Sequence, residues 1–322
     1  MVKYSSEKNQ PVRRKVIVFM LLLLVIILVV TNVWFLDFYV KNRDTNFSGV
    51  KNDKYSLLNP ARNFFKQEDL IINFQPLRDY LNDKYEVDSD VSVYFEYLPT
   101  GANIAISKDA EFYPASLLKV PVAMAVAKKI EKEEWKWGNE LVLMSADKDK
   151  TFGTLYKEPS NSTHTIEDLI RRSLVDSDNT AHFILLRNLE LSEVSMVYDH
   201  MGLEDFMKSD GKISAKRYAV ILRALYNPSY LAEENSQKIL SYLTQSPFKD
   251  YIQGGLPQDV VFAHKIGISG AEKVFLDSGI VYEQNRPYLL TMMIKNRDEQ
   301  KSKEIMKDIS RKIFDYVRNY KD

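Results

Sequence analysis

Two residues at the start of a long apolar stretch could form a nucleophile and its base. Ser116 and Lys119 make the pattern S-x-x-K at the beginning of segment 115–135. On a helix, positions i and i+3 lie on the same face, so the lysine amine can lie beside the serine hydroxyl. Serine is a weak nucleophile until a base takes its proton, and a lysine made neutral by burial can be that base. The pair therefore predicts a serine nucleophile activated by a lysine.

Two further groups follow along the chain, Ser177-Asp178-Asn179 and Lys265-Ile266-Gly267. Each is weak evidence alone, since S-D-N is typical of a helix N-terminus and K-x-G is common. S-x-x-K is also common, but only at Ser116 does it open an apolar helix, where a lysine needs a reason to be buried. The order and spacing of the three groups support a common site: S-D-N begins 61 residues after Ser116, and Lys265 follows Ser177 by 88 residues.

The composition excludes several other kinds of site. The 322 residues contain no Cys, which rules out disulfides, thiol nucleophiles and thiolate metal sites. The four His show no pairing at i and i+4, so we expect no metal and no cofactor. A formal net charge of zero argues against a nucleic-acid partner. A hydrophobic content of 45% indicates a globular chain.

The N-terminal region predicts a membrane anchor. The tail 1–15 carries five basic residues against one acidic residue, and the next 21 residues, Val16 to Leu36, carry no charge. As a helix, such a stretch spans about 30 Å, enough to cross a bilayer core. We expect a cytoplasmic tail at 1–15, a single-pass signal anchor at 16–38, a linker at 39–68 and an extracytoplasmic domain at 69–322. A cleaved signal peptide is the alternative.

The sequence of the domain predicts strands near both of its ends and a helical region between them. Apolar periodicity of 3.6 indicates helices and alternation indicates strands. We expect helices at 70–85, 115–135, 163–175, 177–189, 213–227, 236–245 and 301–320, and strands at 91–108 as a hairpin, 141–145, 261–270, 273–284 and 286–296. Thr165 and Ser177 are placed to cap two of the helices.

The three groups, in this order, resemble those of class A β-lactamases and other serine penicillin-recognising enzymes. The resemblance covers about 70–320 of the chain. It implies an α/β (α+β) fold in which a five-stranded antiparallel sheet is flanked by helices. An all-helical insertion is then expected at about 110–255.

The resemblance also implies a role for each residue. Ser116 becomes the acylated nucleophile and Lys119 its base. Ser177 passes the proton to the leaving amine, with Lys265 beside it setting its acidity. Asn179 holds Lys119 and the substrate amide by hydrogen bonds. An oxyanion hole is expected from the backbone N–H groups of Ser116 and Ile268, in the segment that also contains Gly267.

Two departures from the family concern the second half of the reaction and the substrate. Class A β-lactamases share an E-x-x-L-N loop whose Glu activates the deacylating water. This sequence contains no E-x-x-L-N motif. The loop region, 201–212, is short, and Glu204 is the one weak candidate for that base. Ile266 stands where the family has a hydroxyl residue that binds the substrate carboxylate. Losing a general base costs about 10²–10⁴ in rate, so slow deacylation is expected.

Three functions remain open from the sequence. The first is a membrane-anchored serine hydrolase that opens β-lactams or related acyl-amides. The second is a D-alanyl-D-alanine carboxypeptidase or transpeptidase-like enzyme acting on cell-wall peptide. The third is a module that binds β-lactams or muropeptides without hydrolysing them. The substrate and the oligomeric state are left undetermined.

Overall fold

The computed structural model describes residues 19–20, 22, 28–32, 55–59, 72–86, 88–208 and 210–320. The predicted tail 1–15 and most of the predicted anchor 16–38 lie outside the described residues. Within the described ranges, no helix combines the length and the apolar character needed to cross a bilayer. The described residues from 55 onward form one compact unit.

A five-stranded antiparallel sheet lies at the centre of this unit, with the strand order β2-β1-β7-β6-β5. Its strands are β1 (Val91–Tyr97), β2 (Ala102–Ile106), β5 (Phe262–Ser269), β6 (Val274–Val281) and β7 (Tyr288–Lys295). The first two strands and the last three come from opposite ends of the sequence, as predicted. In this order β5 is an edge strand, and this is the strand that carries Lys265.

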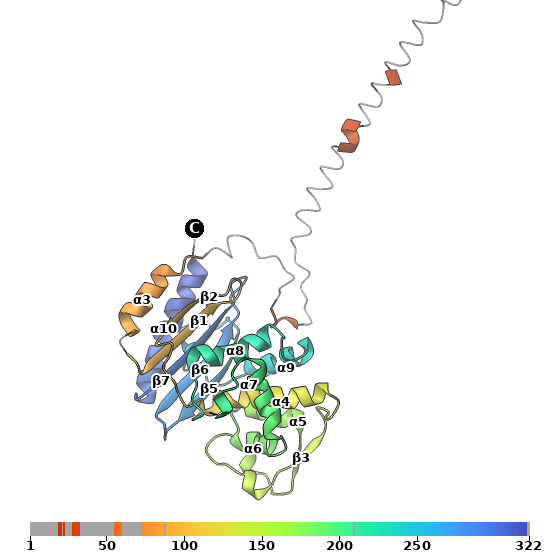
Figure 1. Ribbon diagram of the computed structural model, residues 1–322, viewed down its shortest axis with the longest axis vertical. Helices are drawn as coiled ribbons and strands as arrows, with labels where there is room; N and C mark the ends of the chain where they lie inside the picture. Colours follow the sequence, from red (N-terminus) through yellow and green to blue (C-terminus); the bar gives the residue numbers. More distant parts are fainter. Residues whose placement is uncertain are drawn as a thin grey trace, which may run out of the picture. The chain divides into compact units, whose positions relative to one another are not determined.

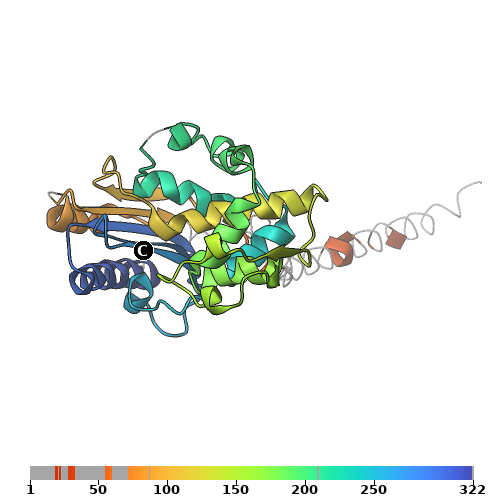
Figure 2. The ribbon, with the colours of Figure 1, turned by 90° about the horizontal axis from the view of Figure 1, so that it is seen from below.

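Each face of the sheet is covered by helices, so both faces are apolar. Along β7, Leu290 and Met292 pack on one face, whereas Leu289 and Met293 pack on the other. This follows from the two-residue period of a strand. Helices α3 (Gln75–Tyr85) and α10 (Glu299–Asn319) cover the first face. Figure 2 shows α10 on one side of the sheet and the helical insertion on the other.

The helical insertion contributes the second apolar core. It contains α4 (Lys119–Glu131), α5 (Ile166–Val175), α6 (Asn179–Arg187), α7 (Leu191–His200), α8 (Ala215–Tyr226) and α9 (Glu233–Leu243). The short strands β3 (Glu140–Val142) and β4 (Thr163–Thr165) pair beside it. These helices follow one another from yellow to cyan in Figure 1. The predicted architecture of a sheet with a helical insertion is confirmed.

Two local predictions are refined by the structure. Thr165 caps α5 as expected, because its hydroxyl accepts a hydrogen bond from the Asp168 N–H. The prediction that Ser177 caps the next helix is wrong: the N-cap of α6 is Asp178, whose carboxylate accepts from the Ala181 N–H. The reason is local, since Ser177 adopts a left-handed backbone conformation with φ 57° and the helix starts one residue later than expected.

Part of the predicted linker packs against the domain. Leu58 is buried in the core of the helical insertion, and the Asn59 N–H donates to the carbonyl of Tyr226 at 2.8 Å. The Tyr282 hydroxyl donates to the carbonyl of Leu57 at 2.8 Å. Residues 55–59 therefore belong to the packed domain, although the sequence around them is polar.

Candidate active site

Ser116 lies on a tight turn that leads into a buried helix. The turn is the 3₁₀ helix η2 (Ala115–Leu118), and α4 continues directly from it. Ala115, just before the serine, has a left-handed backbone with φ 46°, a conformation that is uncommon for residues other than glycine. The Tyr218 hydroxyl of α8 donates to the carbonyl of Leu117 at 2.9 Å and holds the turn in place. The half-buried Ser116 is thus fixed at the start of α4.

The Lys119 amine is the centre of the site. The residue is only 2% exposed, and its Nζ lies 2.8 Å from Ser116 Oγ, as the S-x-x-K spacing predicts. Nζ also lies 2.8 Å from the Ser177 carbonyl oxygen, 3.3 Å from Ser177 Oγ and 2.6 Å from Asn179 Oδ1. One amine therefore joins the predicted nucleophile to the side chains of Ser177 and Asn179 in the S-D-N group.

These contacts suit a neutral amine that can accept a proton. Burial lowers the pKa of Lys119 to about 7, against the attraction of Asp178 and Asp149. The Ser177 carbonyl and Asn179 Oδ1 can only accept hydrogen bonds, so they take the two N–H donors of a neutral amine. The nitrogen lone pair is then left to accept the Ser116 hydroxyl proton. This is the arrangement that a general base for a serine requires.

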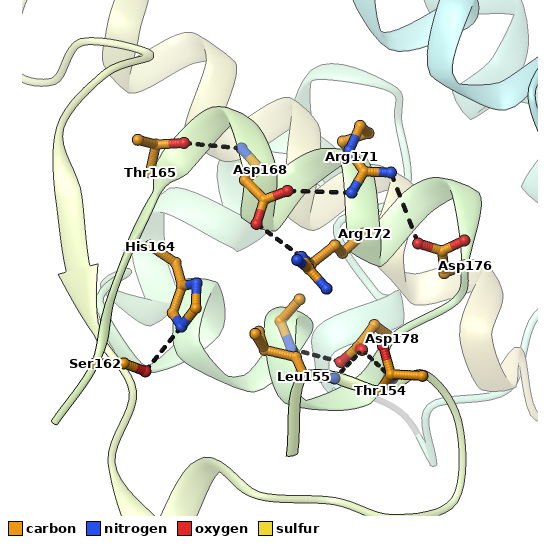
Figure 3. A network of polar contacts seen from close by, with 11 residues as sticks. Thr154, Leu155, Ser162, His164, Thr165, Asp168, Arg171, Arg172, Asp176 and Asp178 are labelled. Atoms are coloured by element: carbon orange, nitrogen blue, oxygen red, sulfur yellow. Dashed lines mark hydrogen bonds and ion pairs between the residues drawn. The ribbon is translucent and has the colours of Figure 1, made fainter. Parts of the chain in front are cut away.

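Asp178, the middle residue of S-D-N, is structural. It is 1% exposed, and Oδ2 accepts hydrogen bonds from the backbone N–H groups of Thr154 and Leu155 at 2.7 and 2.9 Å. Figure 3 shows this carboxylate facing the loop that carries these two residues. Gly153 lies so close that a Cβ there would be 2.1 Å from Asp178 Oδ2, and its φ of +87° also favours glycine. Asp178 thus fastens the loop to the start of α6.

A carboxylate from this loop reaches the other end of the Asn179 amide. Asn179 Nδ2 donates to Asp149 Oδ1 at 2.9 Å. The backbone of Asp149 is held by Thr180, whose hydroxyl accepts from the Asp149 N–H and donates to its carbonyl. Burial opposes ionisation, but hydrogen bonds from Asn179 and Thr151 hold the pKa of Asp149 below its usual value. Sequence reasoning missed this residue, because a lone Asp in a polar loop carries no local signal.

The third predicted group approaches the nucleophile from strand β5. A Cβ added to Gly267 would lie 2.8 Å from the Pro114 carbonyl oxygen, so the strand runs directly against the turn that precedes Ser116. Lys265 is 1% exposed, and burial and the nearby charge of Lys119 place its pKa well below the usual value. Its Nζ donates to the carbonyl of Ile266 at 3.4 Å. Among the described residues, no hydrogen bond joins Lys265 to Ser177, so that predicted contact stays a prediction.

Ile266 lies on the other face of β5. It is 2% exposed and belongs to the core beneath α3 and α10, as does Phe262. Residues two apart in a strand share a face, so Ile266 and Lys265 point to opposite sides of the sheet. His264 lies on the same side as Ile266, buried with its Nδ1 2.8 Å from Asp277 Oδ1.

A buried histidine is a second feature that the sequence analysis missed. His182 follows Asn179 by three positions on α6, and its Nδ1 is buried with no hydrogen-bond partner in the described part of the chain. Burial and the charges of Lys119 and Lys265 lower the pKa of His182 to about 3. It therefore stays neutral and adds no positive charge beside the two lysines.

Glu204, the candidate deacylation base, is not brought into this cluster. It lies exposed in the turn between α7 and the 3₁₀ helix η5 (Phe206–Lys208). Of the carboxylates in the described ranges, none hydrogen-bonds to Ser116 or Lys119. The two carboxylates whose charges act on Lys119, Asp149 and Asp178, are bound to Asn179 and to backbone N–H groups.

Comparison with known proteins agrees with this geometry. Residues 75–317 match the family model described as "Beta-lactamase enzyme family". The chain is 22% identical to beta-lactamase VEB-1 of Pseudomonas aeruginosa over 245 residues, which cover 67% of this chain and 81% of that protein.

Solved structures share the fold. PBP-A superposes with a TM-score of 0.70 and 20% identity, covering 80% of this chain and all of that one. A beta-lactamase from Sphaerobacter thermophilus gives a TM-score of 0.69 at 20% identity, covering 78% of this chain and 100% of that one. A variant of PBP-A has been solved as an acyl-enzyme complex with penicillin G.

The buried carboxylate of Asp178 provides a stability test. Asp178→Asn replaces one acceptor oxygen by a donor and leaves at least one of its backbone N–H partners without an acceptor. We expect the free energy of unfolding to fall by about 2–4 kcal/mol. Urea unfolding measures this free energy, with Asp176→Asn as the control. The side chain of Asp176 is 46% exposed, and its ion pair with Arg171 is long, at 3.8 Å. Equal losses in the two variants would contradict a special role for Asp178.

The pKa of Lys119 predicts the pH dependence of acylation. Only the neutral amine accepts the Ser116 proton, and its fraction rises with pH through a midpoint near 7. Below pH 6, we expect the second-order rate constant for acylation by a β-lactam to fall about tenfold per pH unit. Stopped-flow kinetics between pH 5 and 9 measure it. A rate constant that stays flat from pH 5 to 8 would show that Lys119 is not the base.

Proposed function

Since the chain belongs to the β-lactamase enzyme family, we propose that Ser116 is acylated by β-lactams and related acyl-amides, and that the acyl-enzyme is released slowly. The observation that supports acylation most directly is the 2.8 Å contact between Lys119 Nζ and Ser116 Oγ inside a buried cluster. The nucleophile, its base and the amide of Asn179 are all present and joined by hydrogen bonds.

In this mechanism, Lys119 removes the hydroxyl proton as Ser116 Oγ attacks the carbonyl carbon. The backbone N–H groups of Ser116 and Ile268 stabilise the oxyanion. Because β5 is the edge of the sheet, alternate N–H groups along it are free of the sheet's own hydrogen bonds. Ser177, 3.3 Å from Lys119 Nζ, delivers the proton to the leaving nitrogen.

Slow deacylation is supported by the lack of a base for the second step. A hydrolytic water needs a base near the acylated serine. Apart from Lys119, which serves the first step, the described cluster offers no base, and no carboxylate, in contact with Ser116. Losing a general base costs about 10²–10⁴ in rate. The acyl-enzyme should therefore persist after it forms.

A cell-wall peptide is a second substrate class for the same site. Helix α6 begins with Asn179 and carries two exposed apolar side chains, Phe183 and Leu186, each 39% exposed. Exposed apolar surface on the helix that supplies Asn179 suits a substrate longer than a β-lactam. We therefore propose D-alanyl-D-alanine peptides as the alternative substrate.

We also propose that residues 16–38 anchor the chain in a membrane, with the domain outside the cytoplasm. The proposal rests on the uncharged stretch Val16 to Leu36 and the basic residues before it.

The lifetime of the adduct tests the proposed reaction. The full chain, purified in a mild detergent, is mixed with benzylpenicillin and its intact mass is followed over time. We expect one added benzylpenicillin on the wild type and none on Ser116→Ala. Its decay should be about 10²–10⁴-fold slower than in an enzyme with a working deacylation base.

Glu204→Gln is the matched control for the deacylation step. We expect the same adduct lifetime in this variant, because the Glu204 side chain is exposed and makes no contact with the cluster. An adduct that vanishes as fast as it forms, with steady turnover, would contradict slow release. A much longer lifetime in Glu204→Gln would identify Glu204 as the base.

A further inference from the structure

An acidic side chain lies next to the proposed acyl-binding residue, Asn179. Asp149 is half-buried, and its Oδ1 accepts from Asn179 Nδ2 at 2.9 Å and from the Thr151 N–H at 2.8 Å. In the part of the chain that the structure describes, no lysine, arginine or histidine forms an ion pair with it. Its pKa lies below the usual value, so it carries a negative charge at neutral pH.

The neighbouring cations do not neutralise this charge. Lys148 donates to the Glu158 carbonyl at 2.6 Å and is thereby turned away. Lys150, the next residue along the chain, is exposed and in contact with no carboxylate among the described residues. Lys119 is separated from Asp149 by the Asn179 amide and is half neutral near pH 7. A partly buried, negatively charged carboxylate without a paired cation is stabilised by a cation that a substrate brings to it.

The loop is built to hold the carboxylate in this position. Thr180 clamps the Asp149 backbone with two hydrogen bonds, and the Asn179 N–H donates to the Phe152 carbonyl at 3.1 Å. Asp178 fixes the far end of the loop through Thr154. A carboxylate held by fixed backbone contacts loses little freedom when it binds a ligand, which favours recognition.

A chain of hydrogen bonds connects Asp149 to Asn179, the residue that we expect to hold the acyl side of a substrate. Three hydrogen bonds in series, each shorter than 3 Å, lead from Ser116 through Lys119 and Asn179 to Asp149. The Asn179 amide donates one N–H to Asp149 and has a second N–H for the acyl-amide carbonyl of the substrate. Because Asp149 and that carbonyl would share the same amide nitrogen as donor, a group one or two bonds beyond the carbonyl would approach the Asp149 carboxylate.

We propose that Asp149 is a specificity-determining residue that favours acyl donors with an ammonium group close to the acyl-amide carbonyl. The inference rests on the proposed function of the site, since it concerns which acyl donor reacts with Ser116. The cation would lie over the carboxylate and replace water there with a charge-assisted hydrogen bond. An anionic acyl group would be repelled from the same position.

Two penicillins that differ at one position provide the test. Ampicillin carries an ammonium group on the carbon next to its acyl-amide carbonyl, where benzylpenicillin carries hydrogen. Stopped-flow acylation of the full chain gives the ratio of the two rate constants, ampicillin over benzylpenicillin. We expect Asp149→Asn to lower this ratio about tenfold, because a hydrogen bond between two charged groups is lost for ampicillin only.

Glu158→Gln is the matched control. Glu158 is an exposed carboxylate on the same loop, and the substitution removes the same charge from the surface without touching Asn179. We expect its ratio to equal that of the wild type. A tenfold loss in this variant too would show that a diffuse charge, and not Asp149, sets the preference.

A measurement on the wild type alone keeps the proposal testable if Asp149→Asn does not fold. Raising NaCl from about 0.05 to 0.5 M screens charge pairs, so the preference for ampicillin should shrink. A ratio that is unchanged by salt, or an Asp149→Asn variant that slows both penicillins equally, would show that Asp149 only positions Asn179 and would overturn the proposal. If neither penicillin acylates the wild type, the proposed function itself fails, and this inference with it.

Discussion

The site depends on the burial of one amine. Lys119 is almost fully enclosed, and a charged ammonium in such a place is costly unless it is paired. Burial lowers its pKa to about 7, because its direct contacts are neutral oxygens from Ser116, Ser177 and Asn179 and no carboxylate pairs with it directly among the described residues. An amine that gains and loses a proton near neutral pH can both take the serine proton and give it back. The nucleophile has no other base in contact with it among the described residues.

The rest of the domain holds three separate segments around that amine. The turn η2 supplies Ser116, and the segment at the start of α6 supplies Ser177 and Asn179. Strand β5, which carries Lys265, runs against that turn at Gly267. These segments are far apart in the sequence, and the two apolar cores on either side of the sheet bring them together. The buried Asp178 ties the loop 149–155 to α6, so the same contacts that stabilise the fold also place Asp149 beside Asn179.

Much of this could be predicted from the sequence. Periodicity gave the sheet from both ends of the chain and the helical insertion, and S-x-x-K placed Lys119 beside Ser116, because helix geometry fixes positions i and i+3. Membership in the family followed from the order of the three groups and is confirmed by the match over 75–317.

Other features depend on tertiary contacts that leave no local pattern. The α6 cap is Asp178 and not Ser177, because the serine takes a left-handed backbone conformation. Asp149 and His182 have roles that only the approach of a loop and a helix to Lys119 creates. Residues 55–59 look like linker and yet pack into the domain. Most of the predicted anchor lies outside the described residues, and the anchor stays a prediction.

The most direct test is the titration of the Lys119 amine itself in the free protein. NMR of protein labelled with ¹³C at the lysine Cε follows each amine with pH, and the signal lost in Lys119→Arg identifies this one. We predict that its chemical shift changes with a midpoint near pH 7, more than three pH units below that of an exposed lysine. A midpoint near that of the exposed lysines, about 10.4, would show that Lys119 stays charged and would contradict its role as the base.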